Sequence, residues 1–443
     1  MYPIWVVPYL SSALVIGLIA SFHILPSHLA VGAFWFNIYI ERKAYREGRP
    51  ELLSFIKRYT LLILIFCFVF GSLSGVGIWY SATVSSPRGI SALIHNYVWG
   101  WATEWVFFFI EVATIYAYYY TLGKVDERTH LRLGYLYALS AWISMIIITG
   151  ILGFMLTPGK WLETGGFFDG FFNPTYWPQL GARTFFMFGI AGLYALIIAA
   201  TLKEREVARE VARLAGAWGL GGLLLGGLCG YWWLKKLPSE AQDLLFGGTL
   251  PYLAILLKVA AICGGIVGLY FLVFGLALPR LNNVPLAILT LMVLFLGILS
   301  GEGIREGLRR PYVINGFMYA HQVVGADLPA KGIKSEIEPL NEKGYLARLG
   351  YLPPNLRTIT EKNRVMVGRI LVAHECANCH ALSPKGLRSL PRLLEGLGME
   401  DPEDLAGFLE GLDGYSFMPP FVGTEEERLA AGAYLSTLVK KNP

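Results

Sequence analysis

Long apolar stretches separated by short polar ones run from the N-terminus to about residue 300. A helix of about 20 apolar residues spans the roughly 30 Å hydrocarbon core of a membrane with all its backbone groups paired. We therefore predict eight transmembrane helices. Their approximate bounds are 9–38, 60–82, 97–121, 134–157, 183–202, 214–234, 250–277 and 285–301. The first stretch is too long for a signal peptide and follows no basic segment, so we expect it to remain in the mature chain.

The composition agrees with this pattern. Of the 443 residues, 55% are hydrophobic and 16% are charged, and the mean hydropathy is +0.50. A soluble domain usually has about 25% charged residues. The predicted fold is all-α, a polytopic transmembrane helix bundle surrounded by membrane lipid. The net charge of +5 arises largely in the loops, so we do not predict nucleic-acid binding.

The loops after the first, third and fifth predicted helices are rich in Lys and Arg. They lie at 42–58, 124–132 and 203–213, whereas the loops between them carry few basic residues. Short basic loops stay on the cytoplasmic side of a membrane. The N-terminus and the tail after the eighth helix are therefore predicted to lie on the periplasmic or extracellular side.

The chain becomes polar after the eighth helix. We predict a membrane domain over 1–310, an extracytoplasmic linker over 311–358 and a small domain over 359–443. The small domain contains Cys-Ala-Asn-Cys-His from Cys376 to His380. Two thiols one helical turn apart can each add to a haem vinyl group, and the following imidazole can bind the iron from the same face. The motif predicts one covalently attached haem c.

Two other interpretations of Cys376 and Cys379 are a disulfide and a zinc site completed by His374. Zinc sites usually take two well-separated pairs of ligands, and His380 directly follows Cys379, which makes joint chelation of one ion awkward. The pattern therefore favours haem c. The remaining cysteines lie in apolar stretches and are predicted to be small buried side chains: Cys67, Cys229 and Cys263.

A haem that only transfers electrons needs a second axial ligand, and Met418 is the candidate. It lies in the sequence Phe417-Met418-Pro419-Pro420, where the rigid prolines can hold its thioether over the iron. A thioether ligand would raise the reduction potential. Packing of Met418 in the domain core is the alternative.

Two predicted helices flank these ligands. The first covers 361–375 and has Gly368 available for close contact, and the second opens at a capping box formed by Thr424 and Glu427 and runs to residue 438. This arrangement resembles class I cytochrome c. The resemblance implies a C-terminal extracytoplasmic cytochrome c domain. Haem is attached to CxxCH motifs outside the cytoplasmic membrane, where the loop charges also place this tail.

Ionisable residues within membrane helices are costly, so each is a candidate for a functional site. Glu104 and Glu111 are seven residues apart and share one helix face, which suggests proton movement or metal ligation. His23 lies mid-membrane, and imidazole is a common haem ligand. The alternative role is a structural hydrogen bond between helices for each acid, and a satisfied core residue for His23. The other candidates are His28 and Arg183 within the spans, and Glu302 and Glu306 just beyond the last one.

Three segments resemble subunit I of the cytochrome bd oxygen-reductase superfamily. FHILPSHLAVG resembles the first-helix segment whose His ligates a high-spin haem, which maps to His23. EWVFFFIE resembles the third-helix pair that serves the haem site and its proton path, which maps to Glu104 and Glu111. EGLRRPY resembles the Glu-x-Gly-Arg-Gln-Pro-Trp signature, which maps a second haem-ligating carboxylate to Glu306 and its neighbouring arginine to Arg309.

Two features depart from the quinol-oxidising members. The low-spin haem b ligands of those members map near Met187, beside Arg183, and near Ala260, so that haem is absent, or held by Met187 or His28. Arg183 is assigned to cofactor binding. Only a short segment, about 234–249, replaces the long quinol-binding loop. We expect electrons to enter through the haem c, as in superfamily branches that carry a cytochrome c domain.

The resemblance implies a bd-type terminal oxidase of the bacterial cytoplasmic membrane, with haem c, one or two haem b groups and possibly haem d. It would take electrons from a soluble cytochrome c or another periplasmic donor and reduce O2 to water. Glu104 and Glu111 would carry protons, or Glu104 would ligate a haem. A reductase of another small molecule such as nitric oxide, and a non-catalytic electron-transfer or anchor subunit, stay open. We expect a second membrane subunit, subunit II-like, or a homodimer.

Overall fold

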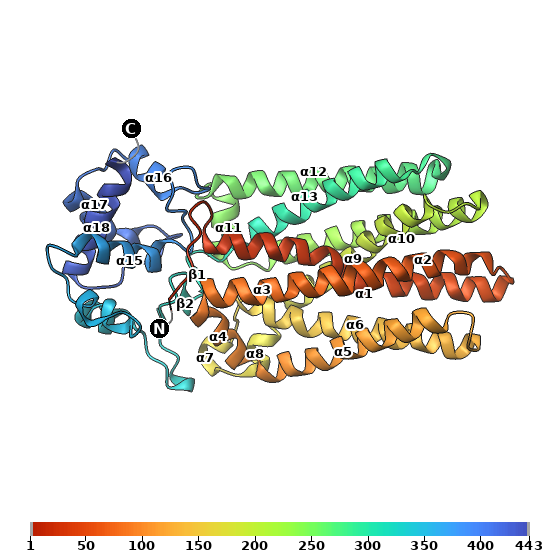
Figure 1. The fold of residues 1–443 in the computed structure, drawn as a ribbon, viewed down its shortest axis with the longest axis horizontal. Helices are drawn as coiled ribbons and strands as arrows, with labels where there is room; N and C mark the ends of the chain where they lie inside the picture. The colour runs from red at the N-terminus through yellow and green to blue at the C-terminus, as the bar shows by residue number, and fades with distance from the viewer. Residues whose placement is uncertain (1–2, 441–443) are drawn as a thin grey trace.

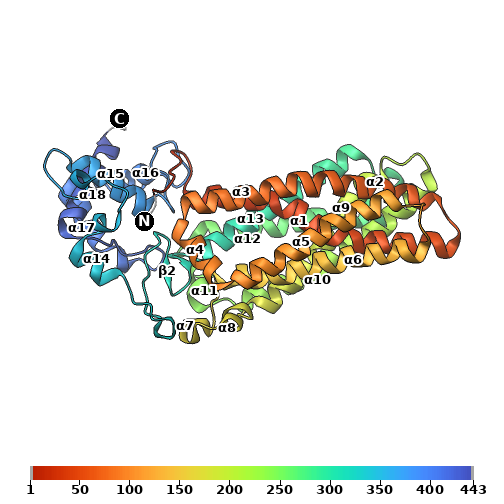
Figure 2. The same ribbon diagram turned by 60° about the horizontal axis from the view of Figure 1, so that its bottom comes forward.

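The structure is a computed structural model that describes residues 3–440. The molecule is elongated: long helices lie side by side in a bundle at one end, and a smaller helical unit covers the other end (Figures 1 and 2). Within the described residues, 8 helices are long and apolar enough to cross a membrane, which confirms the predicted number.

The membrane-length helices are α1 (Ser12–Glu47), α2 continuing through the π-helix η1 into α3 (Glu51–Ser85), α5 (Val98–Thr121), α6 (Glu127–Phe154), α9 (Tyr176–Ala199), α10 (Arg205–Lys235), α12 continuing into the π-helix η2 (Pro251–Ala277), and α13 (Val284–Leu308). Short helices connect them: α4 (Pro87–Asn96), α7 (Trp161–Thr164), α8 (Phe167–Phe171), α11 (Ser239–Phe246) and a 3-10 turn at Pro279–Leu281.

Helix α13 extends seven residues past the predicted end at residue 301. Glu302 forms an ion pair with Arg305 at 2.5 Å, and Glu306 with Arg310 at 3.3 Å. Oppositely charged residues three or four apart stabilise a helix. Glu302 and Glu306 therefore lie in the last turns of α13 and not beyond it, because polar pairs continue the helix where the apolar run stops.

Helix α1 is the centre of the bundle. It packs against α2, α3, α6, α9 and α13. Beside it, α9 and α10 approach each other through glycines: a Cβ added to Gly192 would lie 2.7 Å from the Ala215 carbonyl oxygen. Small residues let helix backbones approach closely where lipid supplies no hydrophobic drive.

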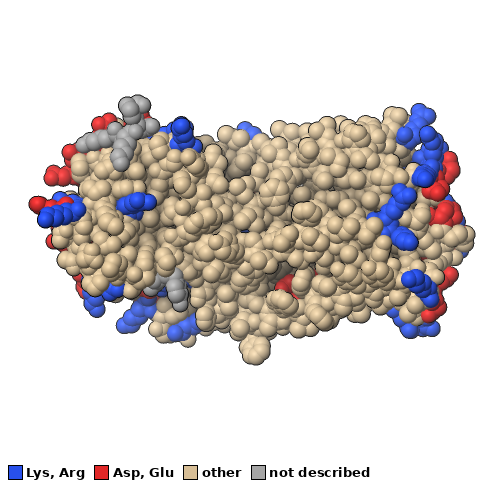
Figure 3. Space-filling view, in the orientation of Figure 1, with Lys and Arg blue, Asp and Glu red and all other residues tan. Residues whose placement is uncertain are grey.

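The loops predicted to be cytoplasmic meet at the end of the bundle opposite the smaller unit (Figure 1). Glu210 joins two of them, since it pairs with Lys43 at 3.2 Å and also with Arg49. On the face shown in Figure 3, charged side chains gather at the two ends and leave the middle almost bare. Such a belt matches the hydrocarbon region that a multi-pass protein crosses.

The smaller unit follows α13. Its elements are the antiparallel strands β1 (Tyr312–Ile314) and β2 (Met318–Tyr319), helices α14 (Ile337–Lys343), α15 (Arg364–Cys376), α16 (Leu390–Gly396), α17 (Pro402–Glu410) and α18 (Glu425–Lys440), and short 3-10 turns at Pro329–Lys331, Leu346–Arg348, Pro354–Leu356 and Leu412–Gly414. Helices α15 and α18 are the two that the sequence predicted, and each lies within a few residues of the predicted bounds.

Helices α15 and α18 cross at Gly368. A Cβ at this position would lie 1.9 Å from the Ala430 carbonyl oxygen and 3.0 Å from Tyr434 Cβ. The predicted capping box is also confirmed: the Thr424 amide donates to Glu427 at 2.9 Å, and the Glu427 amide donates to the Thr424 hydroxyl at 3.3 Å. Because a Cβ at Gly368 would clash with Ala430, glycine is required where α15 and α18 meet.

The segment 311–358, predicted as an extracytoplasmic linker, packs against the helices that follow it. Val323, Tyr345 and Leu346 are buried in the same core as α15 and α18. The backbone amides of Tyr345 and Leu346 each donate to Glu427 at 2.8 Å. These few apolar residues are dispersed among Pro, Gly and charged ones, so the composition of the segment does not show that it packs in this way.

Candidate functional site

The CANCH motif forms a tight turn at the end of α15. The amides of Cys379 and His380 donate to the Cys376 carbonyl at 3.1 and 2.9 Å. Both cysteines are free thiols, so the structure does not contain the disulfide alternative. Burial raises the pKa of both thiols.

The imidazole of His380 is buried. Its Nδ1 is buried and has no hydrogen-bond partner among residues 3–440. Burial, helped by the nearby Arg310 charge, lowers the pKa of His380 to about 4, so the ring is in the neutral form that binds metals. Two thiols and a neutral imidazole are the donors that attachment of a haem to CxxCH requires.

The zinc alternative lacks its third ligand. His374 is hydrogen-bonded through Nε2 to the Tyr351 hydroxyl at 2.7 Å. In the described part of the chain, no group of three or more His, Cys, Asp or Glu side chains is arranged to hold a metal ion.

The Met418 loop is hydrogen-bonded to the segment after α13 and to the last turn of α15. The Met418 amide donates to the Tyr415 carbonyl at 3.0 Å, and the Pro420 carbonyl is bonded to His321 Nε2, also at 3.0 Å. The Val422 amide then donates to Glu375 at 3.2 Å, directly beside Cys376. These contacts hold the loop next to the end of α15, and Met418 itself is half-buried.

The CANCH turn sits directly on the first membrane helix. The amides of Ser12 and Ala13 donate to the carbonyls of Ala377 and Asn378, each at 3.1 Å. The first amides of a helix have no partner within the helix, so this contact satisfies two of them. His23 lies eleven residues after Ser12 on α1, about 16 Å along the helix axis.

Glu306 lies in an ion-pair network at this junction. It binds Arg310 at 3.3 Å and Arg388 at 3.0 Å. Arg388 also lies over the Tyr252 ring, with its guanidinium carbon 5.1 Å from the ring centroid. The backbone of Arg388 has a positive φ of 52°, an uncommon conformation for a residue other than Gly. Both carboxylate oxygens of Glu306 thus have cationic partners in this structure.

Arg309, the arginine that the resemblance assigns to the haem site beside Glu306, contacts other residues. Its Nη1 lies 3.4 Å from the Met155 sulfur, and its Nε is buried with no hydrogen-bond partner in the described chain. Burial lowers the pKa of Arg309 to about 10. Its charge is close enough to interact with those of Glu302 and Glu306.

One ring nitrogen of His23 is engaged by hydrogen bonds. Its Nδ1 is 3.1 Å from the Gly71 carbonyl and 3.0 Å from the Ser74 hydroxyl, both on α3. A histidine that binds a metal through one nitrogen commonly donates the other N–H to a carbonyl, which fixes the tautomer and the ring. Nε2 of His23 is therefore the nitrogen left to bind a haem iron. The π-helix η1 (Phe66–Phe70) directly precedes this contact, and π-helical turns often occur at functional sites.

Arg183 lies within electrostatic range of His23, His28 and Glu302. Unlike Glu302, which pairs with Arg305, Arg183 has no hydrogen bond or ion pair with another described residue. A cation without a partner is costly in a membrane helix, and an anionic group such as a haem carboxylate would stabilise it. Arg183 thus lies near His23, while Glu306 lies about one turn further along α13 than Glu302.

The two carboxylates of α5 face α6. Glu104 accepts a hydrogen bond from the Ser144 hydroxyl of α6 at 2.8 Å. Glu111 is buried, with 6% of its surface exposed, and interacts electrostatically with Glu104. Both lie on one face of the helix, as predicted.

Met187 and His28 are the two residues predicted as alternative ligands of a low-spin haem. Met187 is packed in the core against Gly32, and His28 is bonded through Nδ1 to the Ile24 carbonyl at 3.1 Å. The residues that the sequence missed are Arg305, Arg388, Tyr252 and His321. The i, i+3 spacing of Glu302 and Arg305 was the one available signal.

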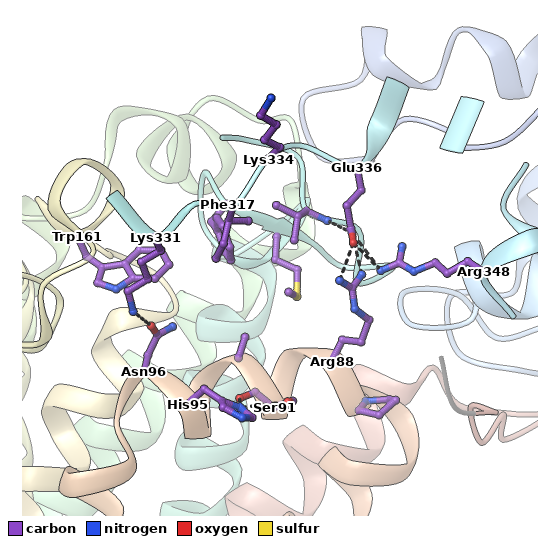
Figure 4. A pocket seen from close by; sticks show the side chains of 15 residues that line it. Arg88, Ser91, His95, Asn96, Trp161, Phe317, Lys331, Lys334, Glu336 and Arg348 are labelled. Carbon is purple, nitrogen blue, oxygen red and sulfur yellow. Dashed lines mark hydrogen bonds and ion pairs between the residues drawn. The ribbon is translucent and has the colours of Figure 1, made fainter. Parts of the chain in front are cut away.

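A further cavity of about 580 Å³ lies near the junction of the two parts (Figure 4). Glu336 enters it between Arg88 at 2.8 Å and Arg348 at 3.0 Å, and Lys331 lies 5.4 Å from the centroid of the Trp161 ring. None of the predicted site residues lines it.

Comparison with known proteins agrees with the membrane domain. The family model described as cytochrome bd terminal oxidase subunit I matches residues 12–263, more than half of the chain. The chain belongs to this family. Its membership identifies a membrane haem oxidoreductase of the oxygen-reducing kind, embedded as a multi-pass protein.

A solved structure, the bd oxidase from Geobacillus thermodenitrificans, shares the fold. It is 16% identical, with a TM-score of 0.60, and the match covers 73% of this chain and 90% of that one. No curated protein matches the chain. The family match ends before α13 and the smaller unit, so conclusions about Glu306 and the CANCH motif depend on the residues of this chain alone.

Proposed function

We propose that this chain is a terminal oxidase subunit that takes electrons from a soluble cytochrome c or another periplasmic donor, rather than from quinol, and reduces O2 to water. Cys376 and Cys379 would hold one haem c covalently, and His380 and Met418 would be its axial ligands. The observation that supports this most is the contact of the CANCH turn with α1, because it joins the proposed haem c attachment motif to the helix that carries His23.

The membrane haems, of b type and possibly d type, would lie near His23 and Arg183. His23 would ligate the iron through Nε2, and Arg183 would pair with the haem carboxylates. Glu306 would be a second ligand only if it released Arg388 or Arg310, since both of its oxygens are engaged. When bound, these haems store electrons and provide the iron that binds O2.

The proposed domains are the membrane domain 1–310 and a class I cytochrome c domain from about residue 359, on the periplasmic side. The free thiols, the α15–α18 crossing and the basic loops at the far end support this assignment. A second membrane subunit or another copy of the chain would cover part of the apolar helix surface.

Haem composition tests the proposal. A pyridine haemochrome spectrum of the purified protein should show one c-type haem for each chain that acid–acetone does not extract, together with extractable haem. Carbon monoxide should change the spectrum of a membrane haem in the reduced protein. If carbon monoxide changed no membrane haem, an electron conduit would be the better description and the oxidase proposal would be wrong.

A further inference from the structure

Helices α5 and α6 lie side by side and run antiparallel through the bundle (Figures 1 and 2). Polar residues meet along this contact at three levels, each seven residues from the next on both helices. The pairs are Tyr118 with His130, Glu111 with Tyr137, and Glu104 with Ser144. Seven residues are about 10 Å of helix, so the three levels span roughly 20 Å.

The level nearest the basic loops contains a buried cluster of three hydrogen-bonded polar residues. Glu41 of α1 accepts a hydrogen bond from the Tyr118 hydroxyl at 2.5 Å and binds His130 Nδ1 at 2.5 Å. His130 Nε2 is bonded to the Tyr118 carbonyl at 2.9 Å. The side chains of Glu41 and His130 are both 0% exposed. At this distance the carboxylate of Glu41 and the imidazole of His130 form a short, direct hydrogen bond.

This cluster has a short connection to water. It lies next to the loop between α5 and α6, which carries one of the predicted cytoplasmic segments. Tyr45, half-buried on α1, interacts with Glu41 and with Glu127, which is exposed at the start of α6. Tyr45 and Glu127 are thus the titratable groups that face the cluster from the solvent side.

The middle level holds Glu111 and Tyr137, between the cluster and Glu104. The Tyr137 hydroxyl is buried, has no hydrogen-bond partner among the described residues and interacts electrostatically with Glu111 and Cys67. Buried hydroxyls are nearly always paired, commonly with an internal water. The Phe34 ring lies between the two levels, 4.9 Å from the Tyr118 ring and 3.8 Å from the Tyr137 ring, measured between centroids.

We propose that Glu41, His130 and Tyr118 form a proton-uptake site at the basic-loop end of the bundle, which supplies Glu111 and then Glu104 along the α5–α6 contact. The inference rests on the proposed function, because O2 reduction consumes protons. The Glu41–His130 pair accepts a proton from solution past Tyr45. It passes a proton through the Tyr118 hydroxyl and water at Tyr137, and is then reprotonated. Only O–H and N–H bonds form and break, and no electron moves.

The alternative is that the cluster only holds α1, α5 and α6 together. Removing one member of a buried ion pair destabilises a protein whatever its function, so a loss of protein alone would not distinguish the two roles. The test therefore needs variants that keep the packing and readouts specific to proton transfer.

The experiment uses the holoenzyme reconstituted in lipid vesicles with an oriented membrane. Glu41→Gln keeps the shape of the side chain and removes its acid. Tyr118→Phe keeps the Glu41–His130 pair and removes only the hydroxyl. Thr60→Val is the matched control: it removes a buried hydrogen bond between Thr60 and Asn37, one helical turn before Glu41 on α1, and no titratable group. Haem content and thermal stability are measured for each variant.

Glu41→Gln should slow O2 consumption by about tenfold or more, as loss of a positioned acid or base does, and raise the solvent deuterium isotope effect. Tyr118→Phe should show a smaller change in the same direction, and Glu41→Asp should restore part of the rate. A pH indicator should report uptake from the compartment that faces the basic loops. Thr60→Val should match the wild type in rate and isotope effect.

The inference is wrong if Glu41→Gln and Tyr118→Phe, with full haem content, have the rate and isotope effect of Thr60→Val. If Glu41→Gln does not fold, Tyr118→Phe decides the question with the same criteria. A wild type that binds its haems but does not consume O2 would overturn the proposed function, and this inference with it. If the wild type consumes O2 and the variants have the same rate and isotope effect as Thr60→Val, only the inference is overturned.

Discussion

The crossing of α15 and α18 at Gly368 gives a sharp test of the C-terminal unit. Replacing Gly368 by Ala would place a Cβ 1.9 Å from the Ala430 carbonyl oxygen, whereas real Cβ contacts are essentially never shorter than 3.0 Å. The difference, 3.0 minus 1.9, means that the helices must separate by about 1.1 Å. Overpacking of this kind costs about 1–3 kcal/mol, and the better helix propensity of Ala returns at most about 1 kcal/mol.

Hydrogen–deuterium exchange of the full chain in detergent, followed by mass spectrometry of α15 and α18 peptides, measures this loss. Each 1.4 kcal/mol is tenfold in an equilibrium constant, so Gly368→Ala should speed exchange in both helices by up to roughly thirtyfold. Gly407 of α17 is the matched control, since a Cβ there would meet nothing within 4 Å. Gly407→Ala should slow exchange slightly. Equal exchange in the two variants would refute the close crossing.

Three further predictions concern the haem sites. Replacing His23 by Ala should remove the high-spin membrane haem signal in an electron paramagnetic resonance spectrum while the c haem remains; retention of both signals would exclude His23 as a ligand. Replacing Met418 by Ala should lower the midpoint potential of the c haem in a redox titration, and an unchanged potential would remove Met418 from the coordination shell. Burial lowers the pKa of His321 to about 4 from 6.5, although its bond to Pro420 opposes this, so the unfolded chain binds the proton more tightly. In exchange experiments the free energy of unfolding of the C-terminal unit should therefore be highest above pH 6.5 and decrease by up to about 3 kcal/mol towards pH 4. His321→Gln should make this pH dependence weaker.

Apolar run lengths were sufficient to predict the eight membrane helices, because a bilayer imposes one length on every span. The CANCH spacing and the Thr424–Glu427 box were likewise local signals, confined to a few consecutive residues. The seven-residue separation of Glu104 and Glu111 predicted their shared helix face. The haem ligands assigned to these positions stay predictions.

Contacts between distant segments could not be predicted in the same way. The seating of the CANCH turn on Ser12 and Ala13 joins residues more than 360 positions apart through backbone groups, which every residue possesses. The Arg388–Glu306 pair likewise depends on how the C-terminal unit docks. The Glu41–His130 pair escaped notice because both residues lie outside the predicted apolar runs, on helices that extend beyond them.

Oxygen consumption by the purified protein with different electron donors tests the central claim most directly. Reduced soluble cytochrome c should support rapid consumption by the wild type, and quinol should support little. The Cys376→Ser, Cys379→Ser double variant should lose the cytochrome c-driven rate while its membrane haems still bind carbon monoxide. Rapid consumption with quinol, unchanged in the double variant, would contradict electron entry through a haem c.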